Sequence, residues 1–148
     1  MLTRLQYSLS GLHLTEQFES CRLVAYLDTK GVPTIGWGHT NGVQLGDTCT
    51  QAQADAWLTE DVQWAANYTN WSVTTQLTQP EFDAVVDFVF NVGSGNFHSS
   101  TMLRLLNAGD FAGAAGEFEK WDLSSGQVVA GLLRRRIAEE TEFNGGTQ

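Results

Sequence analysis

The spacing of apolar and polar residues predicts a chain that begins with a helix and continues into short strands. Residues 8–20 carry Leu9, Leu12 and Phe18 as apolar positions, which predicts a short first helix. Residues 24–48 are rich in Gly, Thr and Val, and period-two stretches alternate there with turn residues. This second pattern is typical of a small antiparallel sheet.

Helix start signals recur after the predicted sheet. The motif T-Q-A-Q at 50–53 has the form of a capping box, in which the Thr hydroxyl and the second Gln side chain satisfy free backbone N–H groups. The helix that it opens is expected to run over 50–68. The motif T-Q-P-E at 78–81 repeats the signal, with Pro in the first turn, where its missing N–H costs nothing. Further helices are expected over 100–107, from a cap at Asp110 onward, and over 127–142.

These elements predict an α+β fold in one domain that spans all 148 residues. We expect a small α/β lobe with a short antiparallel sheet over about 1–48, a connecting helix over 50–68, and a larger helical lobe over 75–148. Two lobes joined by a helix usually enclose a cleft, and clefts of this kind bind substrates. The architecture therefore points to a substrate site between the lobes.

The charge balance narrows the classes of partner. The chain has 8 basic and 17 acidic residues and a formal charge of −9, which argues against a nucleic-acid binder, because such a protein needs a basic face. The only basic cluster, Arg134 to Arg136, is expected to form a solvated or salt-bridged helix face. No apolar run approaches the roughly 20 residues of a membrane span, and the first fifteen residues lack a secretory signal. We therefore expect the protein to start in the cytosol.

Cysteine and histidine usage gives no indication of a metal site. Cys21 and Cys49 do not match a zinc-ligand spacing, and the three histidines are scattered along the chain. Two free thiols are expected, with a single disulfide as the alternative outside the cytosol. His39 is expected to be a structural residue that is hydrogen-bonded within the small lobe. No metal and no cofactor are predicted.

The tryptophans are assigned mainly to packing. Trp57, Trp64 and Trp121 are expected in the core or between the lobes. Trp37 has two open interpretations, packing or stacking against a sugar ring in the cleft.

Three residues of the N-terminal part could perform acid catalysis. Glu19 follows Phe18 at the expected end of the first helix, where apolar neighbours can shield its carboxyl from water and raise its pKa. Asp28 and Thr34 flank a turn, and in a hairpin they are expected to face each other across its mouth and hold one water. An inverting glycosidase uses two carboxyls that are about 6.5–9.5 Å apart and leave room for a nucleophilic water, whereas a closer pair would imply a retaining mechanism. Surface carboxylates without a catalytic role remain the alternative.

The sequence around these residues resembles the phage lysozyme family, glycoside hydrolase family 24. The similarity covers about residues 10 to 143 in the same order. Near the N-terminus it consists of F-E-S-x-R-L-x-A-Y-x-D at 18–28 and G-V-x-T-I-G-x-G-H-T at 31–40. In the helical part it includes L-T-Q at 77–79, F-D-A at 82–84, F-N-V-G at 90–93, S-T at 100–101, L-N-x-G-D at 106–110 and G-L-x-x-R-R at 131–136.

The resemblance implies a muramidase that hydrolyses the β-1,4 bond between N-acetylmuramic acid and N-acetylglucosamine in peptidoglycan during phage lysis. By the same resemblance Glu19 protonates the leaving oxygen, Asp28 positions or activates water, and Thr34 helps to hold that water. The substrate-binding positions implied by the family are Phe90, Asn91, Ser100 and Thr101. Ser20 departs from the family pattern, which commonly has Gly after the acid.

Two other functions are alternatives to this one. A lytic transglycosylase needs no positioned water, and a wall-binding module without catalysis needs none of Glu19, Asp28 and Thr34. The predicted partner is the glycan strand, with no nucleic acid. The predicted enzyme is a monomer that stays in the host cytoplasm until a holin opens the membrane and then acts in the periplasm on the wall. Many lysozymes are basic, so this acidic chain is expected to lack long-range attraction to an anionic wall.

Overall fold

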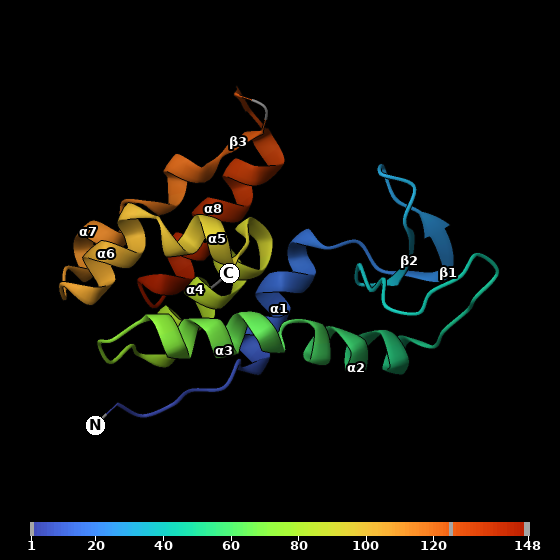
Figure 1. Cartoon of the computed structure of the whole chain (residues 1–148), viewed down its shortest axis with the longest axis horizontal. Coiled ribbons are helices and arrows are strands. Elements are labelled where there is room, and N and C mark those ends of the chain that lie inside the picture. The colour runs from blue at the N-terminus through green and yellow to red at the C-terminus, as the bar shows by residue number, and fades with distance from the viewer. Residues whose placement is uncertain (1, 125, 147–148) are drawn as a thin grey trace.

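The computed structural model describes residues 2–124 and 126–146 and has a mixed α+β fold (Figure 1). The strands are β1 (Arg22–Leu27), β2 (Pro33–Gly36), β3 (Leu123–Ser124) and β4 (Gln127–Val128). The helices are α1 (Leu9–Phe18), α2 (Gln51–Asp61), α3 (Gln63–Ser72), α4 (Gln79–Val92), α5 (Ser94–His98), α6 (Thr101–Asn107), α7 (Phe111–Ala115) and α8 (Ala130–Phe143), with a 3₁₀ helix η1 (Phe118–Trp121). The predicted fold class is confirmed.

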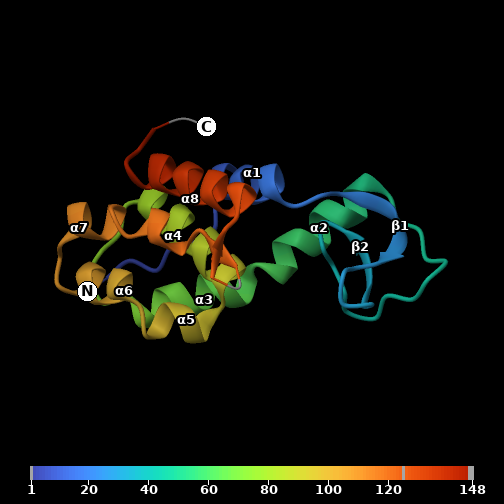
Figure 2. The same ribbon diagram turned by 90° about the horizontal axis from the view of Figure 1, so that it is seen from above.

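The β1–β2 hairpin lies at one end of the molecule, and α2 and α3 connect it with the helical part (Figures 1 and 2). β1 and β2 are antiparallel, with Tyr26 opposite Thr34 and Leu27 opposite Pro33. The short sheet expected within 24–48 is therefore present, and it begins two residues earlier, at Arg22.

The predicted helix over 50–68 is two helices. The capping box at Thr50 is present, with Gln53 as its second residue, and α2 runs from there to Asp61. A bend at Val62 separates α2 from α3, which continues to Ser72. The amide of Val62 still donates to the Leu58 carbonyl at 3.0 Å, so α3 follows α2 nearly in line (Figure 1).

The helical part is built around α4, which packs against α8, α3 and α1. Every residue from Phe82 to Val89 is buried. The ring of Phe88 meets Phe118 and Trp121 edge to face, with centroids 5.5 and 5.6 Å away. Trp121 therefore packs against the core as predicted. Trp64, expected in the core or between the lobes, is 44% exposed, and its ring lies 6.3 Å from that of Phe90 on α4, so it is not a core residue.

The first helix belongs by its contacts to the helical part. Ser8 caps α1 by accepting from the Gly11 amide at 3.2 Å, and its own amide donates to Asp83 of α4 at 3.1 Å. Leu14 and Thr15 are fully buried, whereas Leu9, expected as an apolar position of this helix, is 67% exposed. Only the chain beyond α1 extends into the sheet, although the small lobe was expected to begin at residue 1.

The C-terminal helices follow the predictions with one shift. α6 covers the expected range 100–107 to within one residue, and Asp110 caps α7 by accepting from the Gly113 amide at 2.8 Å. The last helix was expected over 127–142. Residues 127–128 instead form β4 and pair with β3, so α8 begins at Ala130.

Candidate active site

Glu19 lies where the helical part meets the sheet. It is the residue directly after α1, and its amide donates to the Thr15 carbonyl at 3.1 Å. Its carboxyl Oε1 accepts a hydrogen bond from Nη1 of Arg135 on α8 at 3.2 Å. Gly38, just after β2, brings the backbone close on the other side, because a Cβ at this position would lie 3.7 Å from Glu19 Oε2. The carboxyl is therefore held between α8 and the sheet.

The surroundings of Glu19 favour its protonated form. Its side chain is 27% exposed, and burial raises the pKa of this carboxyl above the ordinary value. The positive charge and hydrogen bond of Arg135 oppose this shift, and the negative charge of Asp87 adds to it. The ring of Phe18 covers the Arg135 guanidinium at 5.8 Å. A glutamic acid that keeps its proton in this way is suited to general acid catalysis.

Arg135 is itself held by a buried carboxylate of α4. Its Nε and Nη2 donate to the two oxygens of Asp87 at 2.9 and 2.8 Å, and both side chains are at most 5% exposed. Thr15 Oγ1 donates to Asp87 Oδ1 at 2.7 Å. Burial alone would raise the pKa of Asp87, but the hydrogen bonds of Glu139, Arg135 and Thr15 and the charge of Arg135 lower it to about 2. This bidentate pair fixes the guanidinium that contacts Glu19.

The arginine cluster at the start of α8 is mostly buried. Arg136 is fully buried and donates from Nη2 to Oε2 of the equally buried Glu139 at 2.8 Å. Arg134 is exposed. The expectation of ion pairs holds for Arg135 and Arg136, but the expectation of a solvated face is correct only for Arg134. The acidic residues of α4 and α8 compensate the cost of burying the two guanidinium groups.

Asp28 organises the turn of the β1–β2 hairpin. Its amide donates to the Val32 carbonyl at 3.0 Å, and its Oδ1 accepts from the amides of Lys30 and Val32 at 2.8 and 2.9 Å. The turn between Asp28 and Val32 is therefore three residues long, and it ends on Gly31 with a positive φ of 80°. One carboxylate oxygen of Asp28 has a structural role in this turn.

The prediction that Asp28 and Thr34 face each other is wrong. The three-residue turn places Val32 opposite Asp28, and Thr34 pairs with Tyr26. Thr34 is buried, and its hydroxyl donates to the Val32 carbonyl at 2.8 Å. In an antiparallel pair the two residues still share one face of the hairpin as diagonal neighbours.

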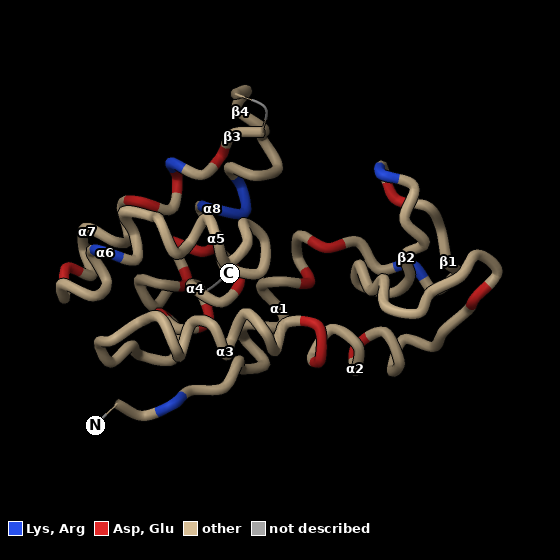
Figure 3. The backbone as a smooth tube through the Cα atoms, viewed as in Figure 1, with Lys and Arg blue, Asp and Glu red and all other residues tan. Residues whose placement is uncertain are grey.

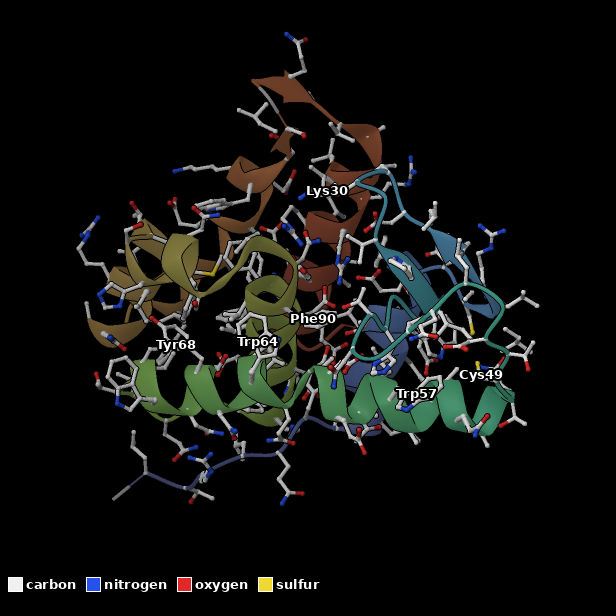
Figure 4. The ribbon with its side chains drawn as sticks, turned by 45° about the vertical axis from the view of Figure 1, so that its right-hand side comes forward. Lys30, Cys49, Trp57, Trp64, Tyr68 and Phe90 are labelled. Carbon is white, nitrogen blue, oxygen red and sulfur yellow. The ribbon has the colours of Figure 1, made fainter. Side chains whose placement is uncertain are left out.

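The four positions expected to bind substrate have different surroundings. Phe90 and Asn91 lie at the end of α4, and the Phe90 ring lies 6.3 Å from that of Trp64. Phe90 and Trp64 are labelled in Figure 4. Thr101 is exposed and lines a pocket with Trp121. Ser100 is buried, and its hydroxyl caps α6 by accepting from Leu103 N at 3.0 Å. Ser100 is therefore committed to the start of the helix.

His39 and Trp37 make structural contacts with α2. His39 is buried, its Nδ1 lies 2.8 Å from Asp61 Oδ2, and its ring stacks on Trp57 at 4.6 Å. The structural interpretation of His39 is supported, with its partner on α2 instead of within the small lobe. Trp37 donates from Nε1 to Asp55 at 2.8 Å and lines a pocket between α1 and α2. This favours the packing interpretation of Trp37.

Sequence reasoning missed the Asp87–Arg135 pair that contacts the candidate acid Glu19. One signal was available, because Asp83 and Asp87 interrupt an otherwise apolar run in the predicted helix. Buried carboxylates require a partner, but the partner lies 48 residues further along the chain. Within the described residues no cluster of His, Cys, Asp or Glu could hold a metal ion, and both cysteines are free thiols.

Comparison with known proteins identifies the family. Residues 16–139 match the model of the phage lysozyme family. The chain is 41% identical over 139 residues to the endolysin of Acyrthosiphon pisum secondary endosymbiont phage 1, covering 90% of this chain and 94% of that protein. Among solved structures, the endolysin from Escherichia coli O157:H7 phage FAHEc1 superposes with a TM-score of 0.91 at 30% identity, covering 100% and 99% of the two chains. The muramidase domain of SpmX from Asticaccaulis excentricus gives a TM-score of 0.88 at 38% identity, covering 95% and 98%.

The chain therefore belongs to the phage lysozyme family. Its predicted function, a glycoside hydrolase of the endolysin type that degrades peptidoglycan in host lysis, is confirmed by this membership. The lytic transglycosylase and the non-catalytic binding module are not favoured.

Proposed function

We propose that Glu19 protonates the glycosidic oxygen of the bond between N-acetylmuramic acid and N-acetylglucosamine. The observation that supports this role most directly is the environment of its carboxyl, which is partly buried between Arg135 and Gly38. Burial raises the pKa of Glu19, so the proton is available at a pH where an exposed glutamic acid has lost it. Arg135 orients the carboxyl through Oε1 and leaves Oε2, the oxygen nearest Gly38, toward the sheet side.

In this proposal Asp28 activates the attacking water. Its Oδ1 is held by two backbone amides of the turn, and the described residues provide no hydrogen bond to Oδ2. Oδ2 can therefore accept a hydrogen bond from water while the turn fixes the carboxylate. The hydroxyl of Thr34, a diagonal neighbour on the same face, is the second group that holds this water. Direct attack by water inverts the configuration at the anomeric carbon.

The glycan strand is proposed to bind between the hairpin and the helical part. Phe90 and Asn91 at the end of α4, and Thr101 at the start of α6, are proposed to contact the sugars. Ser100 is proposed to act indirectly, because its cap fixes the N-terminus of α6 beside Thr101.

Analysis of the products tests hydrolysis. We expect purified protein to release from peptidoglycan fragments that end in a reducing muramic acid, and mass spectrometry identifies these ends. NMR should show that the anomeric carbon of the new end is initially inverted. Asp28→Asn keeps an oxygen for the turn amides but removes the charge that activates water, and we expect it to lower the rate about 10²- to 10⁴-fold. Anhydro-muramic ends from the native protein would mean transglycosylation, and an unchanged rate for Asp28→Asn would exclude Asp28 as the base.

We also propose that the protein is a monomer and reaches the wall when a holin permeabilises the membrane. Among the described residues, no helix is both long and apolar enough to span a bilayer. We expect cells that produce the protein alone to lyse only after chloroform opens the membrane, measured as a drop in turbidity. Prompt lysis without chloroform would contradict holin dependence.

A further inference from the structure

One surface of the helical part is formed by two segments that contain no charged residues. The chain has 8 basic and 17 acidic residues, but no Asp, Glu, Lys or Arg occurs between Asp61 and Glu81 or between Asp87 and Arg104. The first stretch contains α3, and the second contains the end of α4 and α5. α3 packs against both α4 and α5, so the two stretches lie together. Figure 3 shows α3 without the colours of charged residues.

Aromatic rings are arranged along this uncharged surface. Trp64, Tyr68 and Trp71 follow one side of α3 at helical spacing, which separates the first from the last by about 10 Å along the axis. Trp64 is 44% and Trp71 is 71% exposed. The Tyr68 and Trp71 rings are tilted by 45° at 5.7 Å, and those of Trp64 and Phe90 by 41° at 6.3 Å. Since none of these pairs stacks face to face, the exposed ring faces are not covered by one another.

We propose that this aromatic face, formed by Trp64, Tyr68, Trp71 and Phe90, binds the glycan strand outside the catalytic centre. Pyranose rings present C–H groups that stack on indole and phenol faces, and rings spaced along α3 can contact successive sugars. The face is continuous with the proposed substrate site, because Phe90 is common to both (Figure 4). The inference rests on the proposed function in that a glycan strand is taken as the ligand.

The charge pattern favours an uncharged sugar over other partners. Nucleic acids and anionic membranes require clustered Lys and Arg. Arg4 borders this surface, because it donates from Nη2 at 2.7 Å to Oδ1 of Asn67, a helical neighbour of Trp64 and Trp71. A single cation beside the rings is not the cluster that nucleic acids or anionic membranes require. At the edge of the face the Tyr68 hydroxyl lies 3.1 Å from His98 Nδ1, so polar groups suited to sugar hydroxyls accompany the rings. An acidic protein repels anionic walls over a distance, and an uncharged face allows close contact with the sugars despite this charge.

Binding to lipid-free peptidoglycan tests the proposal without digestion of the ligand. The Glu19→Gln variant serves as the background, and sedimentation gives its dissociation constant. Adding Trp64→Leu and Trp71→Leu keeps apolar area but removes the rings, and we expect the dissociation constant to rise about tenfold. Trp64→Phe with Trp71→Phe retains the rings and is expected to stay within about threefold of the background. Leu9→Ala, an exposed apolar residue of α1, is the matched control and is expected to bind as the background does.

Several results would overturn the proposal, and they differ from a failure of catalysis. The variant that adds Trp64→Leu and Trp71→Leu to Glu19→Gln is called the leucine pair. If it binds peptidoglycan as tightly as Glu19→Gln alone and unfolds at the same temperature, the aromatic face is not a glycan site. If the background variant binds phosphatidylglycerol vesicles and the leucine pair does not, while both bind peptidoglycan equally, the aromatic face binds a membrane and not the glycan. If the native protein releases no sugars but the leucine pair still loses binding, the proposed catalytic roles of Glu19 and Asp28 are wrong and the glycan-binding face stands.

Discussion

Glu19→Gln is expected to lower the rate of peptidoglycan hydrolysis by about 10²- to 10⁴-fold, the usual contribution of a general acid. The amide keeps the size of the side chain and an oxygen for Arg135, but its N–H protons are too weakly acidic to be transferred to the leaving group. Clearing of purified walls measures the effect. Glu16→Gln is the matched control, because it makes the same change one turn earlier on α1, and it is expected to retain activity. A Glu19→Gln variant that retains more than about a tenth of the rate would exclude Glu19 as the acid.

The pKa of Glu19 also determines where the rate of hydrolysis falls as the pH rises. The acid works only while protonated, so its contribution is complete below its pKa and is lost as the pH rises through it. Burial raises the pKa of Glu19, so the falling limb should lie at higher pH than the value of about 4.3 for an exposed glutamic acid. Rates on a soluble oligosaccharide measured across pH would show this limb. A limb at or below pH 4.3 would contradict the role of burial.

Much of the fold could be predicted because its signals are local. The capping boxes at Thr50 and Thr78 satisfy their donors within three residues, so the start of a helix is encoded in four positions. The hairpin follows from turn residues and alternation in the same way. The bend at Val62 could not be seen, because the residues on either side continue the same helical pattern and burial of Val62 depends on the tertiary structure.

The candidate site could be predicted only where a motif carries it, and the roles of its residues stay proposals. Glu19 and Asp28 stand in the motif, but the register that separates Asp28 from Thr34 depends on the length of the turn that ends on Gly31. The Asp87–Arg135 pair joins α4 to α8, and no local pattern identifies partners so far apart. Trp64 was expected in the core or between the lobes from its residue type, whereas its side chain is 44% exposed on α3.

The pair of Asp87 and Arg135 supports the second large expected effect. Asp87→Ala should lower the free energy of unfolding by about 3–5 kcal/mol, because the guanidinium of Arg135 would stay buried without its main partner. Urea denaturation measures the change. Combining Asp87→Leu with Arg135→Met removes both charges, and the double variant should be more stable than Asp87→Ala. A loss below about 1 kcal/mol for Asp87→Ala would mean that water or Glu19 replaces the lost partner.

Acid denaturation and catalysis should both respond to Asp87→Asn. The pKa of Asp87 is about 2 when folded and about 3.9 in an unfolded chain, so its ionised form stabilises the fold above pH 4, and this stability is lost as the pH falls toward 2. Asp87→Asn should therefore flatten the pH dependence of unfolding in this window. Asp87 also raises the pKa of Glu19, so the variant should shift the falling limb of activity to lower pH. A purely structural Asp87 would change the unfolding curve and leave that limb in place, whereas a shift of both shows that the charge of Asp87 on α4 helps to set the pKa of the proposed acid Glu19.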